Sequence, residues 1–384
     1  MSKEPEIVVG ICTKNCEDTI QNVLKNVDEG LRGFFPEKNS VILVSDFSED
    51  STEKMVKKTK TVTPVVFRRQ EGGPGKGNGV KTIFKFVLKS EANKLALIDG
   101  DLLSIKPEWI KALIEPLEKG FELVVPYYKR HKYDSVITNH VLYPFVACMY
   151  GKEIRQPVGG EFALSRRLVE KLIKHPKFPS GFGIDIFITT SALADNMRVA
   201  ESTLGVKNHA STQGYKNFEK SLLPMFDQVV STLFELTLYN KEKIKNISDI
   251  EKVTRFGNID DIPVNESVID HKELYQKFLE ETPKILNSNV FSQKTKEHLK
   301  EIINNKEMVS VNVWCDALFD AFDYYVKTLD IESVLRSLRL VWMGRLASFV
   351  QQTQFMNNSD AECLIKGQID IFKERKACFN FFGF

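Results

Sequence analysis

The sequence is poor in cysteine and has no long run of apolar residues. Its 384 residues contain six scattered cysteines, at positions 12, 16, 148, 315, 363 and 378. None forms a CxxC pair or a Cys/His set with metal-ligand spacing, which excludes a disulfide scaffold and is typical of reduced thiols. The longest apolar runs, such as residues 141–150, are shorter than the roughly 18 residues of a membrane-spanning helix. The N-terminal residues also do not fit a signal peptide. We therefore expect a cytoplasmic protein without a transmembrane segment.

Charge of one sign is not in excess either. The chain has 53 Lys and Arg against 51 Asp and Glu, a net charge of +2. Proteins that bind nucleic acids or anionic membranes usually carry a basic surplus. We therefore expect no nucleic-acid partner, and any site for an anion must be local. The chain is long enough for one large domain and a second.

The two parts of the chain differ in pattern. Up to about residue 210, short β-branched runs alternate with longer periodic segments, as in IVVGIC, SVILVSD and TPVVFRR with helical stretches between them. This alternation predicts an α/β fold with a mostly parallel, Rossmann-like sheet and flanking helices. After about residue 222 long amphipathic helices are predicted at 221–240, 292–304, 314–328, 331–352 and 360–379. We therefore predict a catalytic domain at 1–221 and a mainly helical C-terminal region at 222–384.

The stretch ALIDGDLLS, residues 96–104, ends an apolar run with two carboxylates. In an extended backbone residues i and i+2 point to the same side, so Asp99 and Asp101 can aim at one cation while Gly100 lets a ligand approach. Carboxylates with room for diphosphate oxygens suit Mg²⁺ or Mn²⁺. The alternative is a strand end followed by a turn, since Asp-Gly is a common turn dipeptide.

The stretch EGGPGKGNG, residues 71–79, is rich in glycine but lacks the Walker A spacing, because Lys76 is followed by Gly77 rather than Ser or Thr. A nucleotide triphosphatase is therefore not indicated. Backbone N–H groups around Gly75, a helix N-terminus and Lys76 can still form an anion site. The alternative is a flexible surface loop.

Two later segments and one histidine complete the candidates. Gly159, Gly160 and Glu161 place paired glycines before a carboxylate, and Asp185 opens a predicted helix at 186–194. A plain turn and a helix-start carboxylate are the alternatives. His209 follows the strand-like MRVAEST; a lone histidine is more often structural than a ligand. His209 becomes a stronger candidate for a metal ligand only if the aspartates form a metal site.

The order of these motifs resembles that in nucleotide-sugar glycosyltransferases of the GT-A fold. ICTKN, VSDFSED, GPGKGNG, LIDGD, QPVGGEF, GFGIDI and NHA occur as they do in the retaining mannosylglycerate, glucosylglycerate and glucosyl-3-phosphoglycerate synthases. The resemblance covers about residues 6–211. It implies a hexosyltransferase that moves mannose or glucose from GDP-mannose or UDP-glucose to D-glycerate or 3-phosphoglycerate, which makes a glycosylglycerate compatible solute with the help of Mg²⁺ or Mn²⁺.

The resemblance also assigns roles to matching residues. Asp101 and His209 match the metal ligands, and Lys76 matches a lysine that contacts the donor diphosphate. The other matches bind the donor (Thr13, Lys14, Asp46, Gly75, Asp99, Gly100), lie near the donor sugar or acceptor (Gly159, Gly160, Glu161, Asp185), or lie in the acceptor pocket (Thr138). Asp185, Glu161 and Lys76 are thus the catalytic candidates.

One segment departs from the family pattern. The phosphoglycerate enzymes have a Gly-Arg-Val-Thr type segment where this chain has SVIT, residues 135–138. Without that arginine, bidentate recognition of a phosphate is weakened at this position. We therefore favour free glycerate as the acceptor, with Arg130 or Lys132 as partners for its carboxylate.

Residue chemistry alone leaves the stereochemistry open. A retaining enzyme needs no protein base, because the departing phosphate oxygen can take the acceptor's proton, whereas an inverting one needs a carboxylate such as Asp185 or Glu161. An inverting GT-A transferase acting on a lipid-linked or polysaccharide acceptor is therefore the alternative. A third hypothesis is a nucleotide-sugar sensor or scaffold, which would bind the donor without transferring its sugar. The helical region has apolar faces that could pack on the same chain or form a homo-oligomer.

Overall fold

The structure is a computed structural model that describes residues 4–210, 222–258 and 263–379. The chain divides into two units. The first comprises Met1–Lys129, Ile154–Leu236 and Lys252–Pro263, and the second comprises Arg130–Glu153, Thr237–Glu251 and Val264–Phe384. Each unit is described separately below.

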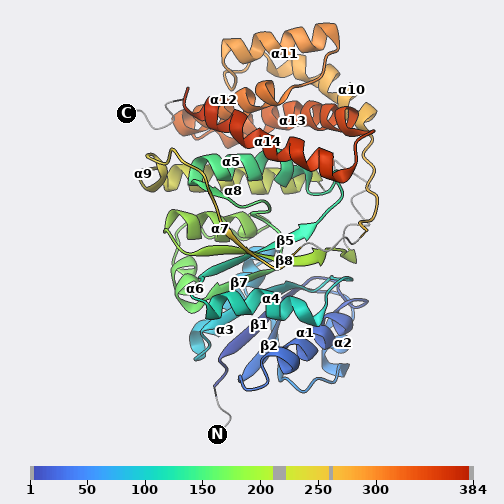
Figure 1. The fold of residues 1–384 in the computed structure, drawn as a ribbon, viewed down its shortest axis with the longest axis vertical. Helices are drawn as coiled ribbons and strands as arrows, with labels where there is room; N and C mark the ends of the chain where they lie inside the picture. Colours follow the sequence, from blue (N-terminus) through green and yellow to red (C-terminus); the bar gives the residue numbers. More distant parts are fainter. Residues whose placement is uncertain (1–3, 211–221, 259–262, 380–384) are drawn as a thin grey trace. The chain divides into compact units, whose positions relative to one another are not determined.

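The first unit is built from alternating strands and helices, as the sequence pattern predicts (Figure 1). In chain order its elements are β1 (Ile7–Thr13), α1 (Ile20–Phe34), β2 (Ser40–Asp46), α2 (Thr52–Lys58), β3 (Val65–Arg69), α3 (Lys76–Lys89), β4 (Lys94–Asp99), α4 (Pro107–Glu118), β5 (Leu123–Lys129), β7 (Phe162–Ser165), α6 (Arg166–Ile173), α7 (Ile184–Ala194), β8 (Val199–Val206), most of α8 (Leu223–Tyr239) and β10 (Thr254–Phe256).

These strands form one eight-stranded sheet in the order β10-β8-β5-β7-β4-β1-β2-β3. β7 runs antiparallel to both of its neighbours, and the remaining pairs are parallel. The mostly parallel sheet with flanking helices is confirmed. β7 and β10 are not predicted from the sequence, because they have only four and three residues and carry little alternation.

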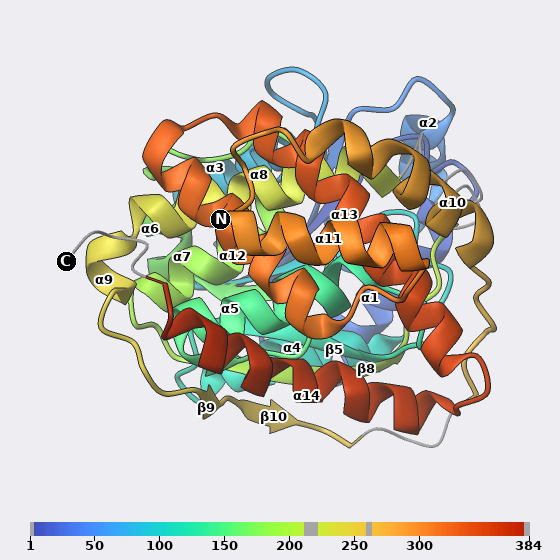
Figure 2. The same ribbon diagram turned by 90° about the horizontal axis from the view of Figure 1, so that it is seen from above.

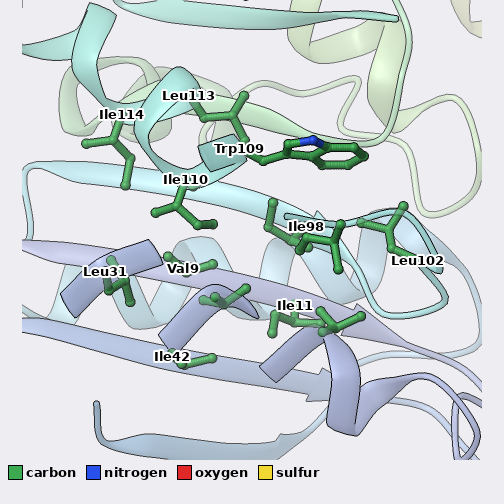
Figure 3. Close-up of a cluster of buried hydrophobic side chains, with 14 of the residues drawn as sticks. Val9, Ile11, Leu31, Ile42, Ile98, Leu102, Trp109, Ile110, Leu113 and Ile114 are labelled. Carbon is green, nitrogen blue, oxygen red and sulfur yellow. The ribbon is translucent and has the colours of Figure 1, made fainter. Parts of the chain in front are cut away.

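Alternating side chains of each strand face different helices. In β1, Val9 and Ile11 are fully buried against a core that α1 and α4 cover, with Leu31 and Trp109 among its members (Figure 3). Gly10 faces the other side, where an added Cβ would lie 2.5 Å from a side-chain carbon of Ile83 in α3. The sheet is therefore buried on both faces, which leaves its strand ends as the place for polar chemistry.

The second unit is mainly helical, which confirms the predicted helical C-terminal region (Figure 2). Its elements are the π-helical turn η1 (Thr138–Leu142), α5 (Tyr143–Tyr150), β6 (Lys152–Glu153), α9 (Lys241–Ile244), β9 (Glu251–Lys252), α10 (His271–Glu281), the 3₁₀ turn η4 (Thr282–Ile285), α11 (Gln293–Asn305), α12 (Val311–Thr328), α13 (Ile331–Thr353) and α14 (Asn358–Lys376). β9 lies across the boundary of the units and pairs with β6.

The division differs from the single boundary at residue 221 that the sequence suggests, because residues 130–153 belong to the helical unit. All eight residues of α5 are buried, so this helix has no face for solvent and must be covered by other helices. Within its unit it packs against α14, where Tyr143 and Ala147 share a core with Ile365. The expected helix start at Ser221 lies outside the described residues.

Among the described residues, no helix combines the length and the apolar character that crossing a membrane would require.

Candidate active site

The carboxyl ends of three neighbouring parallel strands carry polar side chains in the first unit. In the register of the sheet, Thr13 at the end of β1 lies beside Asp46 at the end of β2, and Cys12 lies beside Asp99 at the end of β4. Ligands of such sheets bind outside the carboxyl ends of the strands. The motifs ICTKN, VSDFSED and LIDGD therefore meet at one edge of the sheet.

Asp46 is fully buried and is held by two neighbours. Its carboxylate accepts a hydrogen bond of 2.7 Å from the hydroxyl of Thr13 and an ion pair of 2.5 Å from Arg69 in β3. Lys14, the third candidate for the nucleoside, is exposed. Arg69 is not predicted from the sequence as a site residue. The register of β2 and β3, which places Arg69 beside Asp46, identifies it in the structure.

We expect Arg69→Met to lower the free energy of unfolding by about 1–2 kcal/mol. The change leaves Asp46 buried with only the hydrogen bond from Thr13. Because the guanidinium of Arg69 is exposed to solvent, the lost ion pair contributes only modestly to stability. Chemical denaturation measures this. Arg68→Met is the matched control: Arg68 is exposed and points to the other side of the strand, so its effect should stay within about 0.5 kcal/mol. Equal destabilisation by the two variants would contradict this account of Asp46.

The glycine-rich loop packs closely against the segment that precedes Asp185. Gly75 has φ +130°, and a Cβ there would lie 2.3 Å from the carbonyl oxygen of Ser180; at Gly77 it would lie 2.0 Å from that of Pro179. The amide of Asn78 donates to Ser180 over 3.1 Å. The glycines are therefore required by backbone contact, which argues against the alternative of a flexible surface loop. Helix α3 begins at Lys76.

Lys76 joins Asp99, which is predicted to bind the donor, and Asp185, a predicted catalytic carboxylate. Its ammonium lies 2.8 Å from a carboxylate oxygen of Asp99 and 3.3 Å from one of Asp185, and its side chain is 18% exposed. Burial alone would lower the pKa of Lys76, but the charges of Asp185 and Asp99 outweigh it and raise the pKa well above its usual value. The site thus holds a permanent positive charge at the first residue of a helix, where the backbone N–H groups also favour anions.

Lys207 is a central residue of the site that sequence reasoning missed. Its ammonium lies 2.9 Å from Asp99 and 2.8 Å from Glu161, and its side chain is 5% exposed. It also donates to the carbonyl oxygen of Gly159 over 2.8 Å. The signal in the sequence is slight: a lysine between the end of a strand and His209.

Glu161 is a fully buried carboxylate enclosed by its hydrogen-bond partners. Besides Lys207, the phenol of Tyr128 in β5 donates to it at short range. Burial raises the pKa of Glu161 to about 7, against the opposing charge of Lys207. For Asp99 burial acts in the same direction, but Lys207 and Lys76 together hold its pKa well below the usual range. Asp99 is therefore ionised, and Lys207 and Lys76 bracket it.

Asp101 and His209 are brought together on the other side of Gly100. Nδ1 of His209 lies 3.5 Å from a carboxylate oxygen of Asp101, and the two side chains are 17% and 24% exposed. Backbone pairing fixes this approach, since Leu102 and His209 form a β-bridge and the amide of Ala210 donates to the carbonyl of Asp101 over 2.9 Å. Asp99 and Asp101 thus have different partners.

No cluster of three or more His, Cys, Asp or Glu suitable for a metal occurs in the described part of the chain. The Asp101–His209 pair supplies one carboxylate oxygen and one imidazole nitrogen. Such a pair suits a cation whose remaining ligands come from a diphosphate and water, which is how Mg²⁺ and Mn²⁺ are commonly held.

The predicted acceptor residues Arg130 and Thr138 lie in the second unit. Thr138 is buried at the start of the π-helical turn η1, a conformation that is common at functional sites. The ammonium of Lys132 donates to the carbonyls of Thr353, over 2.7 Å, and Met356, over 2.5 Å, at the end of α13. Lys132 is therefore engaged in holding the end of α13.

The mostly parallel sheet, the carboxylates at its strand ends and the lysine of the glycine loop define a glycosyltransferase domain of the GT-A class. A family model described as "Mannosylglycerate synthase, GT domain" matches residues 39–231, just over half of the chain. The chain belongs to this family. The match includes every predicted site residue except Thr13 and Lys14.

Two curated relatives are similar over part of the chain. Mannosylglycerate synthase of Rhodothermus marinus is 26% identical over 51% of this chain and 54% of its own length. Mannosylglycerate synthase of Selaginella moellendorffii is 27% identical over 44% of this chain and 42% of its own length. The chain thus spans about half the length of the curated relatives it matches.

Among solved structures, glucosyl-3-phosphoglycerate synthase from Mycobacterium tuberculosis is similar to 61% of this chain, with 80% of its own chain covered, 25% identity and a TM-score of 0.49. A likeness at this score supports no conclusion about substrate.

Proposed function

We propose that this protein is a retaining hexosyltransferase, dependent on a divalent cation, that moves mannose or glucose from a nucleotide sugar to glycerate. The observation that carries the proposal is Lys76: a largely shielded ammonium, 18% exposed, at the first residue of α3, paired with Asp99 at a strand end and with Asp185. An ammonium at the N-terminus of a helix can stabilise the negative charge of a departing diphosphate. Membership of the mannosylglycerate synthase family supports the choice of glycerate.

The chemistry follows from where negative charge develops. When the bond between sugar and diphosphate breaks, charge builds on the leaving oxygen, and Lys76 together with the N-terminal amides of α3 stabilises it. Asp101 and His209 would hold the cation, which when bound supplies Lewis-acid stabilisation of the same leaving group. Thr13, Lys14 and Asp46 remain predicted contacts of the nucleoside, and Gly159 and Gly160 of the sugar.

Two features favour retention over inversion. Glu161 is fully buried between Lys207 and Tyr128, and Asp185 is paired with Lys76. A general base must reach the proton it removes, so neither carboxylate is well placed to activate an acceptor hydroxyl. In a retaining transfer the leaving phosphate oxygen takes that proton, and no protein base is needed.

A donor-by-acceptor grid tests the proposal. The purified protein is incubated with Mg²⁺ or Mn²⁺, with UDP-glucose or GDP-mannose, and with glycerate, 3-phosphoglycerate or no acceptor, and release of nucleoside diphosphate is measured. We expect release only when an acceptor is present, and faster release with glycerate, because residues 135–138 lack the phosphate-binding arginine of the phosphoglycerate enzymes. No release in any combination would refute the proposal.

A further inference from the structure

The ammonium of Lys207 contacts three of the residues predicted from the sequence. It donates to Asp99, to both carboxylate oxygens of Glu161 and to the carbonyl oxygen of Gly159, over 2.8–3.0 Å. The group therefore lies at the junction of three chain segments: the end of β4, the segment before β7 and the loop after β8.

The first consequence is electrostatic. Asp99 and Glu161 are close enough that the backbone amide of Asp99 donates to the Glu161 carboxylate over 3.4 Å. Two carboxylates that meet at a site with little solvent repel each other unless a cation lies between them. Lys207 is that cation, and it binds one oxygen of Asp99 while Lys76 binds the other. Lys207 thus fixes the orientation of the carboxylate that holds Lys76.

The second consequence concerns the peptide bond between Gly159 and Gly160. Lys207 binds its carbonyl oxygen, and in a trans peptide the N–H points the opposite way. Gly160 has φ +90°, and a Cβ there would lie 2.1 Å from a carboxylate oxygen of Asp99 and 2.7 Å from the ammonium of Lys207. The backbone therefore lies directly against the ion pair, and the N–H of Gly160 is directed away from Lys207.

We propose that Lys207 is a positioning residue for the transfer. It acts through Asp99, whose second oxygen it holds so that the first stays on Lys76, and through the Gly159–Gly160 peptide, whose orientation it fixes. This inference rests on the proposed function, and it assigns Lys207 a role that neutralising buried charge alone would not require.

The test compares Lys207→Met with the double variant Lys207→Met/Glu161→Gln. The double variant removes a cation and an anion together, so it relieves the uncompensated charge but does not restore the hold on Asp99 or on the Gly159 carbonyl. We expect Lys207→Met to lower both Tm and kcat, the latter by about 10–100-fold. In the double variant we expect Tm to recover while kcat stays low.

Arg166→Met serves as a control for damage to the fold. The Arg166 guanidinium donates to carbonyls of Val87, Leu88, Ser90 and Ala92 at the far end of α3, and it touches no site residue. We expect it to lower Tm but not kcat at a temperature where the variant is folded. Recovery of kcat together with Tm in the double variant would overturn the inference, as would an unchanged kcat in Lys207→Met. An inactive parent protein would instead refute the proposed function.

Discussion

Lys76→Met is expected to lower kcat by about 10²–10³-fold, the usual effect of removing one donor that stabilises a developing negative charge. The methionine keeps most of the length and apolar contact of the lysine but cannot neutralise a diphosphate. The carboxylates of Asp99 and Asp185 also lose the cation that they share, which would leave the leaving group facing uncompensated negative charge. Initial rates of nucleoside diphosphate release at saturating donor and acceptor measure the effect.

Lys89→Met is the matched control for this variant. Lys89 is exposed in the last turn of the same helix, so the change removes an equal charge from α3 without touching the site. We expect its rate to stay within about twofold of the parent. A rate for Lys76→Met close to that of Lys89→Met would show that Lys76 does not act on the leaving group.

The second large effect is expected at the Asp101–His209 pair. Asp101→Asn and His209→Ala should each weaken binding of Mn²⁺ at least about 100-fold, because each removes one of the two candidate protein ligands. The rate should fall accordingly at low cation concentration and recover partly when the cation is raised. Calorimetric titration with Mn²⁺ in the presence of the nucleoside diphosphate measures the binding directly.

Asp18→Asn provides the control, because Asp18 is an exposed aspartate that precedes α1. Its cation affinity should match that of the parent protein. Cation binding that is unchanged in both Asp101→Asn and His209→Ala would contradict a metal site at this pair, and the cation would then have to be sought elsewhere.

Much of the first unit follows from the sequence, because strand and helix periods differ and glycine, proline and acidic residues mark the ends. The pattern predicts β1, β2 and β3. It does not predict that β7 runs antiparallel between β4 and β5, since a four-residue strand carries no information about its partners. Nor does it predict that residues 130–153 belong to the helical unit, which depends on long-range packing of α5.

The site shows the same division between local signals and long-range contacts. Lys76, Asp99, Glu161 and Asp185 all belong to one charge network, and each stands in a motif with an unusual local composition. Lys207 stands in no such motif, and only the fold brings it to Asp99, 108 positions away in the chain. The different partners of Asp99 and Asp101 likewise result from tertiary contacts that the Asp-Gly-Asp sequence does not encode.

The central claim, retaining transfer of a hexose to glycerate, is tested most directly by NMR of the product. The donors are α-linked, so the account predicts an α-glycosidic hexosyl group on a glycerate hydroxyl, with one-bond C1–H1 coupling typical of an α anomer. A β-linked product would contradict retention and favour the inverting alternative, and free hexose as the sole product would contradict transfer to glycerate.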